Sequence, residues 1–90
     1  MGWMEIIKVQ AADRRASEAC LNYLRALEQQ IKKKKTTDIS IYTHAAFQEH
    51  LMISLKWGTP IPNRPGSRLS SLLVQELKQF GLVDLSTWKS

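Results

Sequence analysis

Hydrophobic and polar residues alternate in four short segments of the chain, and this alternation predicts β-strands over 3–10, 38–44, 49–57 and 82–89. Successive side chains of a strand point to opposite faces of a sheet, so each segment has an apolar side to bury. The third segment has the clearest pattern. Its apolar side holds Leu51, Ile53, Leu55 and Trp57, and its mixed side holds His50, Met52, Ser54 and Lys56.

Two other segments have the spacing of amphipathic helices. The first runs from Asp13, a plausible N-cap, to Lys35 and contains neither Gly nor Pro. Its apolar stripe consists of Ala16, Cys20, Tyr23, Leu24, Leu27 and Ile31. The second helix is predicted to follow the cap residue Ser67 and to end at a C-capping Gly81. Its predicted apolar face consists of Leu69, Leu72, Leu73, Leu77 and Phe80. Between the elements, 58–66 holds all three prolines and is predicted to be a loop.

The order strand-helix-strand-strand-helix-strand predicts a ferredoxin-like α+β fold, with residues 1–90 as a single domain. In this fold the four strands form one antiparallel sheet, and right-handed connections place both helices on the same face. The opposite face then has no cover within one chain. By alternation it carries Met4, Ile6, Tyr42, Met52, Leu82 and Trp88, mixed with Ser40, His44, Ser54, Lys56, Asp84 and Ser86.

An apolar face of this kind on a small protein usually marks an interface or a ligand site. Packing of the face against a second copy around a two-fold axis would bury it. The sequence therefore predicts a homodimer through the open sheet face, with the polar members of the face lining or ringing a cavity.

The chain also resembles the dimeric α+β barrel superfamily, which includes antibiotic-biosynthesis monooxygenase-like proteins. The order of elements, the third strand HLMISLKWG and the closing phrase GSRLSSLLVQELKQFGLVDLSTW carry the resemblance, which is closest in the C-terminal third. It implies a homodimer whose two sheets pair face to face into a barrel.

Most of the functional residues of the haem-degrading members of the superfamily are missing from this chain. Those proteins place an iron-binding His on the second helix and an Asn near the end of the first strand. Here 67–80 contains no His, and 9–12 reads Val-Gln-Ala-Ala. Trp57 matches a Trp that ends the third strand in the group, and we interpret it as a packing residue. Cofactor-independent oxygenases of the group rely on the pocket and on the reactivity of the substrate, so this sequence neither supports nor excludes their chemistry.

Charge and composition narrow the classes of partner. The formal net charge is +5, and the lysine run Lys32, Lys33, Lys34 and Lys35 supplies four of these charges. The third strand lacks the aromatic phrase of RNA-binding sheets. A solvated helix end is therefore favoured for the run over nucleic-acid binding, and nucleic acid is not expected as a partner. No apolar stretch is long enough for a membrane span, and the N-terminus lacks the pattern of a signal peptide, so a cytoplasmic protein without membrane contact is expected. The single Cys20 is interpreted as a buried structural thiol.

His44 and His50 flank the predicted hairpin, but two histidines without a third ligand are a weak signal for metal, and neither a metal nor another cofactor is expected. Tyr42 and His44 lie two residues apart on the uncovered face. They could transfer a proton there, or their polar groups could be hydrogen-bonded at a dimer interface.

The sequence does not decide whether the protein is an enzyme. The favoured hypothesis is that a small apolar or aromatic ligand binds in the barrel. Oxidation of this ligand without a cofactor is an extension of that hypothesis. The alternatives are a structural or stress-related dimer without a substrate and a weak nucleic-acid binder acting through the lysine run. The candidate ligand-binding residues are Tyr42, His44, Met52 and Trp88.

Overall fold

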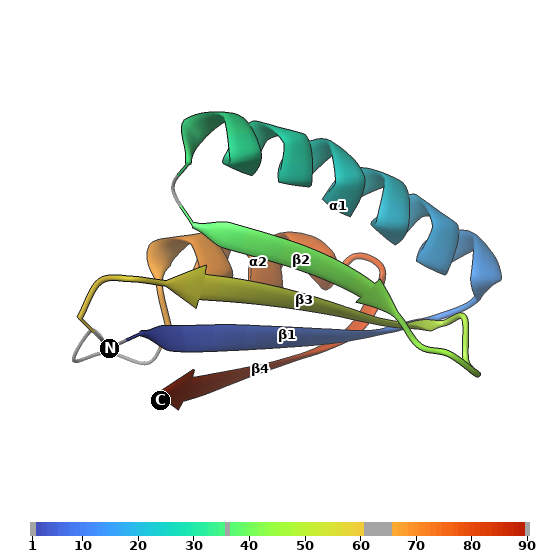
Figure 1. Ribbon diagram of the computed structural model, residues 1–90. Helices are drawn as coiled ribbons and strands as arrows, with labels where there is room; N and C mark the ends of the chain where they lie inside the picture. The colour runs from blue at the N-terminus through green and yellow to red at the C-terminus, as the bar shows by residue number, and fades with distance from the viewer. Residues whose placement is uncertain (1, 36, 61–65, 90) are drawn as a thin grey trace.

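The protein folds as two helices over one face of a four-stranded antiparallel sheet (Figure 1). A computed structural model describes residues 2–35, 37–60 and 66–89. The elements are β1 (Trp3–Ala11), α1 (Arg14–Lys34), β2 (Asp38–Thr43), β3 (His50–Trp57), α2 (Arg68–Leu77) and β4 (Gly81–Lys89). The strands are ordered β2-β3-β1-β4, so the ferredoxin-like order predicted from the sequence is confirmed.

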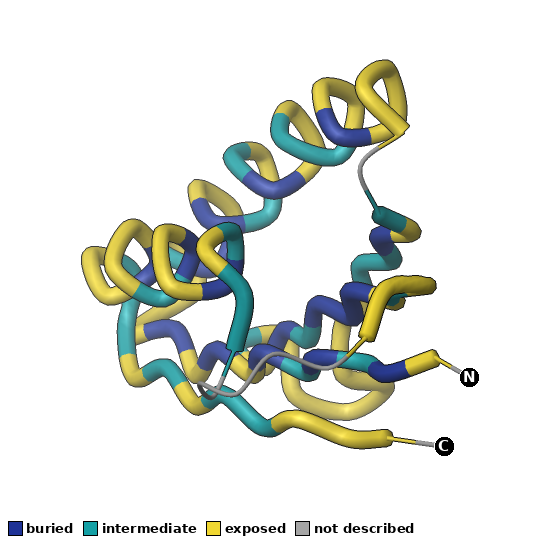
Figure 2. Tube along the Cα trace, turned by 90° about the vertical axis from the view of Figure 1, so that its left-hand side faces the viewer, coloured by how far each residue is buried: buried dark blue, intermediate teal, exposed yellow. Residues whose placement is uncertain are grey.

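The register of the sheet sorts the side chains as alternation predicted. Ile7 on β1 pairs with Ile53 on β3 and with Leu85 on β4, and all three lie on the side of the helices. Lys8, one residue further, pairs with Met52 and Asp84 on the opposite side. Both helices lie on the same side of the sheet in Figure 2, which leaves the second face without a cover.

The core fills the layer between the sheet and the helices. It combines the inner sides of β1 and β3 with the apolar stripe of α1, and its buried members include Ile7, Cys20, Leu24, Ile53, Leu55 and Leu77. The α1 stripe is confirmed because Cys20, Leu24 and Ile31 are buried and Ala16, Tyr23 and Leu27 pack against them. The Asp13 side chain accepts a hydrogen bond from the Ala16 amide (2.7 Å), which confirms it as the N-cap of α1. No helix in the described residues is long and apolar enough to cross a membrane.

The helix α2 differs from the prediction at its end and on its face. The C-cap is Lys78, and Gly81 is the first residue of β4. A Cβ at Gly81 would lie 2.0 Å from the Gln10 carbonyl oxygen, so glycine is required here by the close approach of β4 to β1.

Leu72 was predicted to lie on the buried face of α2 but is 65% exposed. The helix instead turns Ser70, Leu73 and Leu77 inward. The buried Ser70 hydroxyl is satisfied because it donates to the Ser67 carbonyl oxygen (2.9 Å) and accepts from the Ser67 amide (3.0 Å). Because the capping box satisfies its hydroxyl, Ser70 can be buried on the face of α2 where Leu72 was predicted to lie.

Small differences at the strand ends affect one candidate residue. β1 continues to Ala11, β3 begins at His50, and β2 ends at Thr43, which leaves His44 outside the strand. The predicted loop 58–66 lies partly outside the described residues, because 61–65 are not described.

The buried thiol of Cys20 gives the fold a dependence on alkaline pH. Burial raises the pKa of Cys20 to about 11, whereas the thiol of an unfolded chain ionises at about 8.5. Between these values the unfolded chain binds fewer protons than the folded chain, so the free energy of unfolding falls as pH rises. We expect this fall between pH 8 and pH 10 in urea unfolding followed by circular dichroism. Cys20→Ala should reduce the slope, and an identical slope in the variant would contradict the assignment.

Candidate ligand site on the open sheet face

Four rows of side chains cross the open face of the sheet, because neighbouring strands pair residue by residue. One row holds Gln10, His50 and Leu82, and the next holds Lys8, Tyr42, Met52 and Asp84. The third row consists of Ile6, Ser40, Ser54 and Ser86, so three of its four side chains are short. The last row, at the start of β1, holds Met4, Asp38, Lys56 and Trp88.

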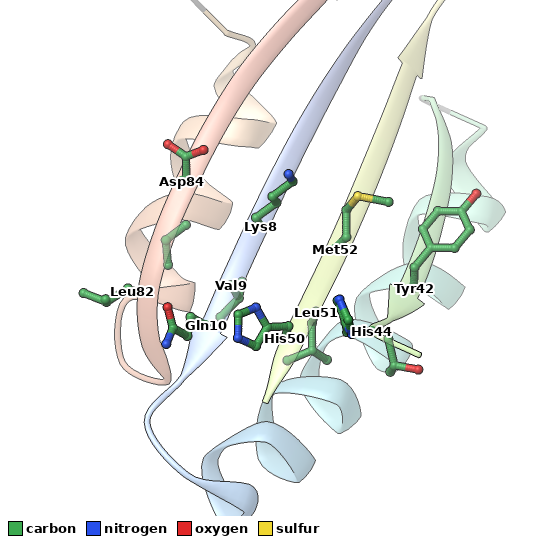
Figure 3. A pocket seen from close by; sticks show the side chains of 12 residues that line it. Lys8, Val9, Gln10, Tyr42, His44, His50, Leu51, Met52, Leu82 and Asp84 are labelled. Carbon is green, nitrogen blue, oxygen red and sulfur yellow. The ribbon is translucent and has the colours of Figure 1, made fainter. Parts of the chain in front are cut away.

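The first two rows border a concavity of about 470 Å³ on the open face (Figure 3). All four strands and the turn after β2 contribute its polar members, which include Lys8, Gln10, His44 and His50. Its apolar surface includes Met52, the half-exposed ring of Tyr42 and the 73% exposed Leu82. A mostly apolar hollow with a few placed polar groups is the usual composition of a small-molecule site.

The imidazole of His44 stabilises the turn between β2 and β3 through hydrogen bonds. Its Nδ1 accepts hydrogen bonds from the backbone amides of Ala46 (3.0 Å) and Phe47 (3.1 Å). Nδ1 must be unprotonated to accept these bonds, and the ring is held as a cap of the turn. The structure therefore leaves only Nε2 of His44 for a ligand, and it corrects the expectation that His44 projects from a regular strand beside Tyr42.

His50 is the better placed histidine for chemistry. It begins β3 on the open face, pairs with Gln10 on β1, and its ring centroid lies 5.7 Å from that of His44. Phe47 contacts both rings, with centroids 5.1 Å from His44 and 5.7 Å from His50. Among the described residues, no side-chain hydrogen bond holds the His50 imidazole, so both nitrogens are available to a ligand.

Lys8 and Asp84 bring opposite charges to the second row. Their Cα atoms are register partners on β1 and β4, and both side chains are exposed. Neither takes part in an ion pair within the described part of the chain. The sequence analysis placed Asp84 on this face, and its candidate set included neither Asp84 nor Lys8.

Trp88 does not belong to this concavity. It pairs with Met4 at the opposite end of the sheet and borders a second concavity of about 330 Å³. Tyr42, His44 and Met52 therefore border one concavity, while Trp88 is separated from them by the row of Ser40, Ser54 and Ser86. Alternation assigns the face of a residue, but only the register assigns its row.

On the opposite face, a buried carboxylate was missed by the sequence analysis. Glu5 is fully buried among the helix-facing residues, between Trp3 and Ile7. It accepts hydrogen bonds from Trp57 Nε1 (2.7 Å), the Ser67 hydroxyl (2.7 Å) and the Ser67 amide (2.9 Å). The carboxylate thus joins β1, β3 and the N-terminus of α2, where the helix dipole favours negative charge. Its position on the apolar side of an alternating strand was the signal for its burial.

The remaining candidates contribute no site in the described residues. No group of three His, Cys, Asp or Glu side chains that could hold a metal occurs there. Trp57 stacks on Trp3 (centroids 5.7 Å apart) and donates to Glu5, as expected of a packing residue. The lysines 32–35 are exposed at the end of α1, where Lys32 pairs with Glu28 at 3.7 Å.

Comparison with solved structures identifies the same fold in proteins of very different sequence. A conserved protein of unknown function from Bacteroides thetaiotaomicron superposes with a TM-score of 0.76 at 10% identity, over 99% of this chain and 97% of that one. An antibiotic biosynthesis monooxygenase gives 0.70 at 11% identity, over 98% and 97%. SnoaB, a cofactor-independent oxygenase from Streptomyces nogalater, gives 0.64 at 5% identity, over 99% and 92%.

No family model and no curated protein sequence matches the chain. At these identities the structural likeness shows the fold alone. The chain has the ferredoxin-like α+β fold of the antibiotic biosynthesis monooxygenase-like proteins, as the resemblance in its sequence implied.

The Glu5 contacts predict a large effect of a small substitution. Glu5→Gln keeps the shape of the side chain but replaces one acceptor oxygen by a donor that faces hydrogen-bond donors from Trp57 or Ser67. We expect the free energy of unfolding to fall by about 2 kcal/mol, because buried donors lose their acceptor.

The matched control is Glu18→Gln on the exposed surface of α1, where Glu18 pairs only with Arg14. It should change stability by less than about 0.5 kcal/mol. Urea unfolding of both variants at pH 7 measures the difference. Equal stabilities of the two variants would show that Glu5 does not hold the helix to the sheet.

Proposed function

We propose that the protein is a homodimer that pairs its open sheet faces and binds a small apolar or aromatic molecule in the concavity of His50, Tyr42 and Met52. One observation carries the proposal: the concavity lies on the sheet face opposite both described helices, α1 and α2. Apolar surface is exposed along that face, with Leu82 at 73%, Trp88 at 60% and Tyr42 at 50%.

A second copy is the occupant that suits the shape of the face. The row of Ile6, Ser40, Ser54 and Ser86 has short side chains, and Ser54 is almost fully buried by its neighbours. Two sheets can approach closely along such a row, while the longer side chains on either side fill or border the remaining space. The concavity, open in a single chain, then becomes enclosed by the partner.

The lining of the concavity indicates the class of ligand. Met52, Leu82 and the Tyr42 ring provide apolar contact, which favours a hydrocarbon or aromatic ring. His50 and Gln10, paired on neighbouring strands, offer hydrogen bonds at one side of it. A ring that carries a hydroxyl or carbonyl group matches both parts of the site.

Oxidation of that ligand is the reaction suggested by the fold shared with a cofactor-independent oxygenase. In the proposed step a CH₂ group activated by adjacent rings or carbonyls loses a proton to His50 and reacts with dioxygen. One oxygen atom becomes the carbonyl oxygen of the product, and the other leaves as water with both hydrogens of the CH₂ group. The step is balanced with dioxygen alone as the oxidant, and His50 has a ring nitrogen available as the proton acceptor.

The dimer is tested first. Light scattering of the purified protein at micromolar concentration should give about twice the chain mass of 10.3 kDa. Met52→Glu should shift the mass toward that of one chain, because the seam would bury an unpaired charge. The matched control Leu72→Glu places the same charge on an exposed leucine of α2 and should leave the mass unchanged. A folded wild-type protein that stays monomeric would exclude the dimer.

The ligand is tested by thermal denaturation with a library of small aromatic compounds. A compound that binds the folded state raises the Tm. His50→Ala and Tyr42→Ala should each reduce this rise by at least half, whereas Lys33→Ala with Lys34→Ala should leave it unchanged. Compounds that raise the Tm are then incubated with protein in air, and oxygen uptake is followed with an electrode.

Each outcome distinguishes the alternatives. Thermal shifts with oxygen uptake that His50→Ala abolishes support the oxygenase, and thermal shifts alone support a binding protein. A dimer that responds to no compound supports the structural alternative and overturns the ligand site. Loss of binding in the lysine variants alone would place the ligand elsewhere.

A further inference from the structure

The second concavity lies at the end of the sheet where β1 begins and where β3 and β4 end. Its lining comes from two adjacent rows of the sheet. Trp3 lies between Trp57 and Lys89 in one row, and Met4 lies between Lys56 and Trp88 in the next. Because successive side chains alternate between the faces, the first row lies on the helix side and the second on the open side, and the lining passes around the end of the sheet. The concavity is separate from that of His50 and Tyr42, and the two share no lining residue.

All three tryptophans of the chain line this one concavity. Trp3 and Trp57 stack with their rings 18° from parallel, and Trp88, on the open side of the sheet, is 60% exposed. Exposed tryptophan is costly in water and is typical of sites that bind flat, apolar groups. The shape and chemistry of the lining therefore favour an aromatic ring.

Among the described residues, the charged members of the lining are both lysines, Lys56 and Lys89. Asp38 is the register partner of Lys56 on β2, but no ion pair joins them in the described part of the chain. Glu5 lies near Trp57 but is occupied by three hydrogen-bond donors. Two lysines without acidic partners favour a negatively charged ligand.

One polar group at this site has no partner. The indole N–H of Trp3 is buried and donates no hydrogen bond within the described residues. By contrast, Trp57 donates to Glu5 and Trp88 donates to the Ser86 hydroxyl at 2.9 Å. A buried donor left unsatisfied is destabilising, and an acceptor group that reaches it would relieve that cost.

We propose that this concavity binds an aromatic carboxylate at the end of the sheet, with the ring at the tryptophans and the carboxylate attracted by the positive charges of Lys56 and Lys89. This site differs from the first concavity in its lining residues and in its preferred charge. Met4, Lys56 and Trp88 lie on the face that the proposed dimer would cover, so a partner chain would approach this ligand as well.

The probe is 2-naphthoate, and its uncharged analogue 2-naphthamide is the control ligand. Isothermal titration calorimetry should give naphthoate an affinity at least tenfold higher than that of naphthamide. The combined variant Lys56→Gln and Lys89→Gln should remove this preference, and Lys89→Gln alone should reduce it. The matched control Lys33→Gln with Lys34→Gln removes two positive charges from the end of α1 and should preserve it.

Nuclear magnetic resonance locates the ligand. The three tryptophan side chains give three indole N–H signals, and naphthoate should shift all three in a saturable way, with that of Trp3 moving toward the position of a hydrogen-bonded indole. His50→Ala should leave naphthoate binding unchanged, which separates this site from the one proposed above.

Three results would overturn the proposal: equal affinities for the two ligands, a charge preference that survives the removal of Lys56 and Lys89, or indole signals that do not move. If His50→Ala abolishes naphthoate binding, the ligand occupies the first concavity. That result would support the proposed function and reject this site.

Discussion

Two helices cover one face of a four-stranded sheet and leave the other open, and this constraint determines where the protein can act. The covered face is filled by a core from β1, β3 and the helices, with Ile7, Leu24, Ile53 and Leu55 fully buried. The described concavities with the most apolar lining lie on the open face and at one of its ends. The proposed partner chain and the proposed ligands would therefore use the same surface.

Glu5 illustrates how the covered face is closed. A carboxylate in a core is costly unless its hydrogen bonds are satisfied, and here β3 and the N-terminus of α2 provide the donors. Gly66, at φ 84°, keeps this junction compact, since a Cβ there would lie 3.2 Å from Glu5 Oε2 and 2.9 Å from Ser70 Oγ. With both carboxylate oxygens occupied and the residue fully buried, Glu5 is a structural residue, and candidate chemistry moves to the exposed His50.

Alternation was sufficient to predict the faces of the strands, because a period of two assigns each side chain without knowledge of its neighbours. It could not predict rows, so Trp88 was grouped with Tyr42 although the register places them at opposite ends. Gly81 was read as a helix cap because contact between β4 and β1 is not visible in sequence. Leu72 and His44 were misplaced because local hydrogen bonds, in the α2 capping box and in the turn after β2, outweighed hydrophobicity and strand periodicity.

The central claim is that a second copy of the chain covers the open face. Isotope-filtered nuclear Overhauser spectroscopy on a mixture of labelled and unlabelled protein tests it directly, because it detects only contacts between chains. The ε-methyl groups of Met4 and Met52 both lie on the open face and are convenient probes. Contacts from these methyls to open-face residues of the other chain are predicted. Interchain contacts confined to the helices, or none in a folded sample at high concentration, would contradict the account.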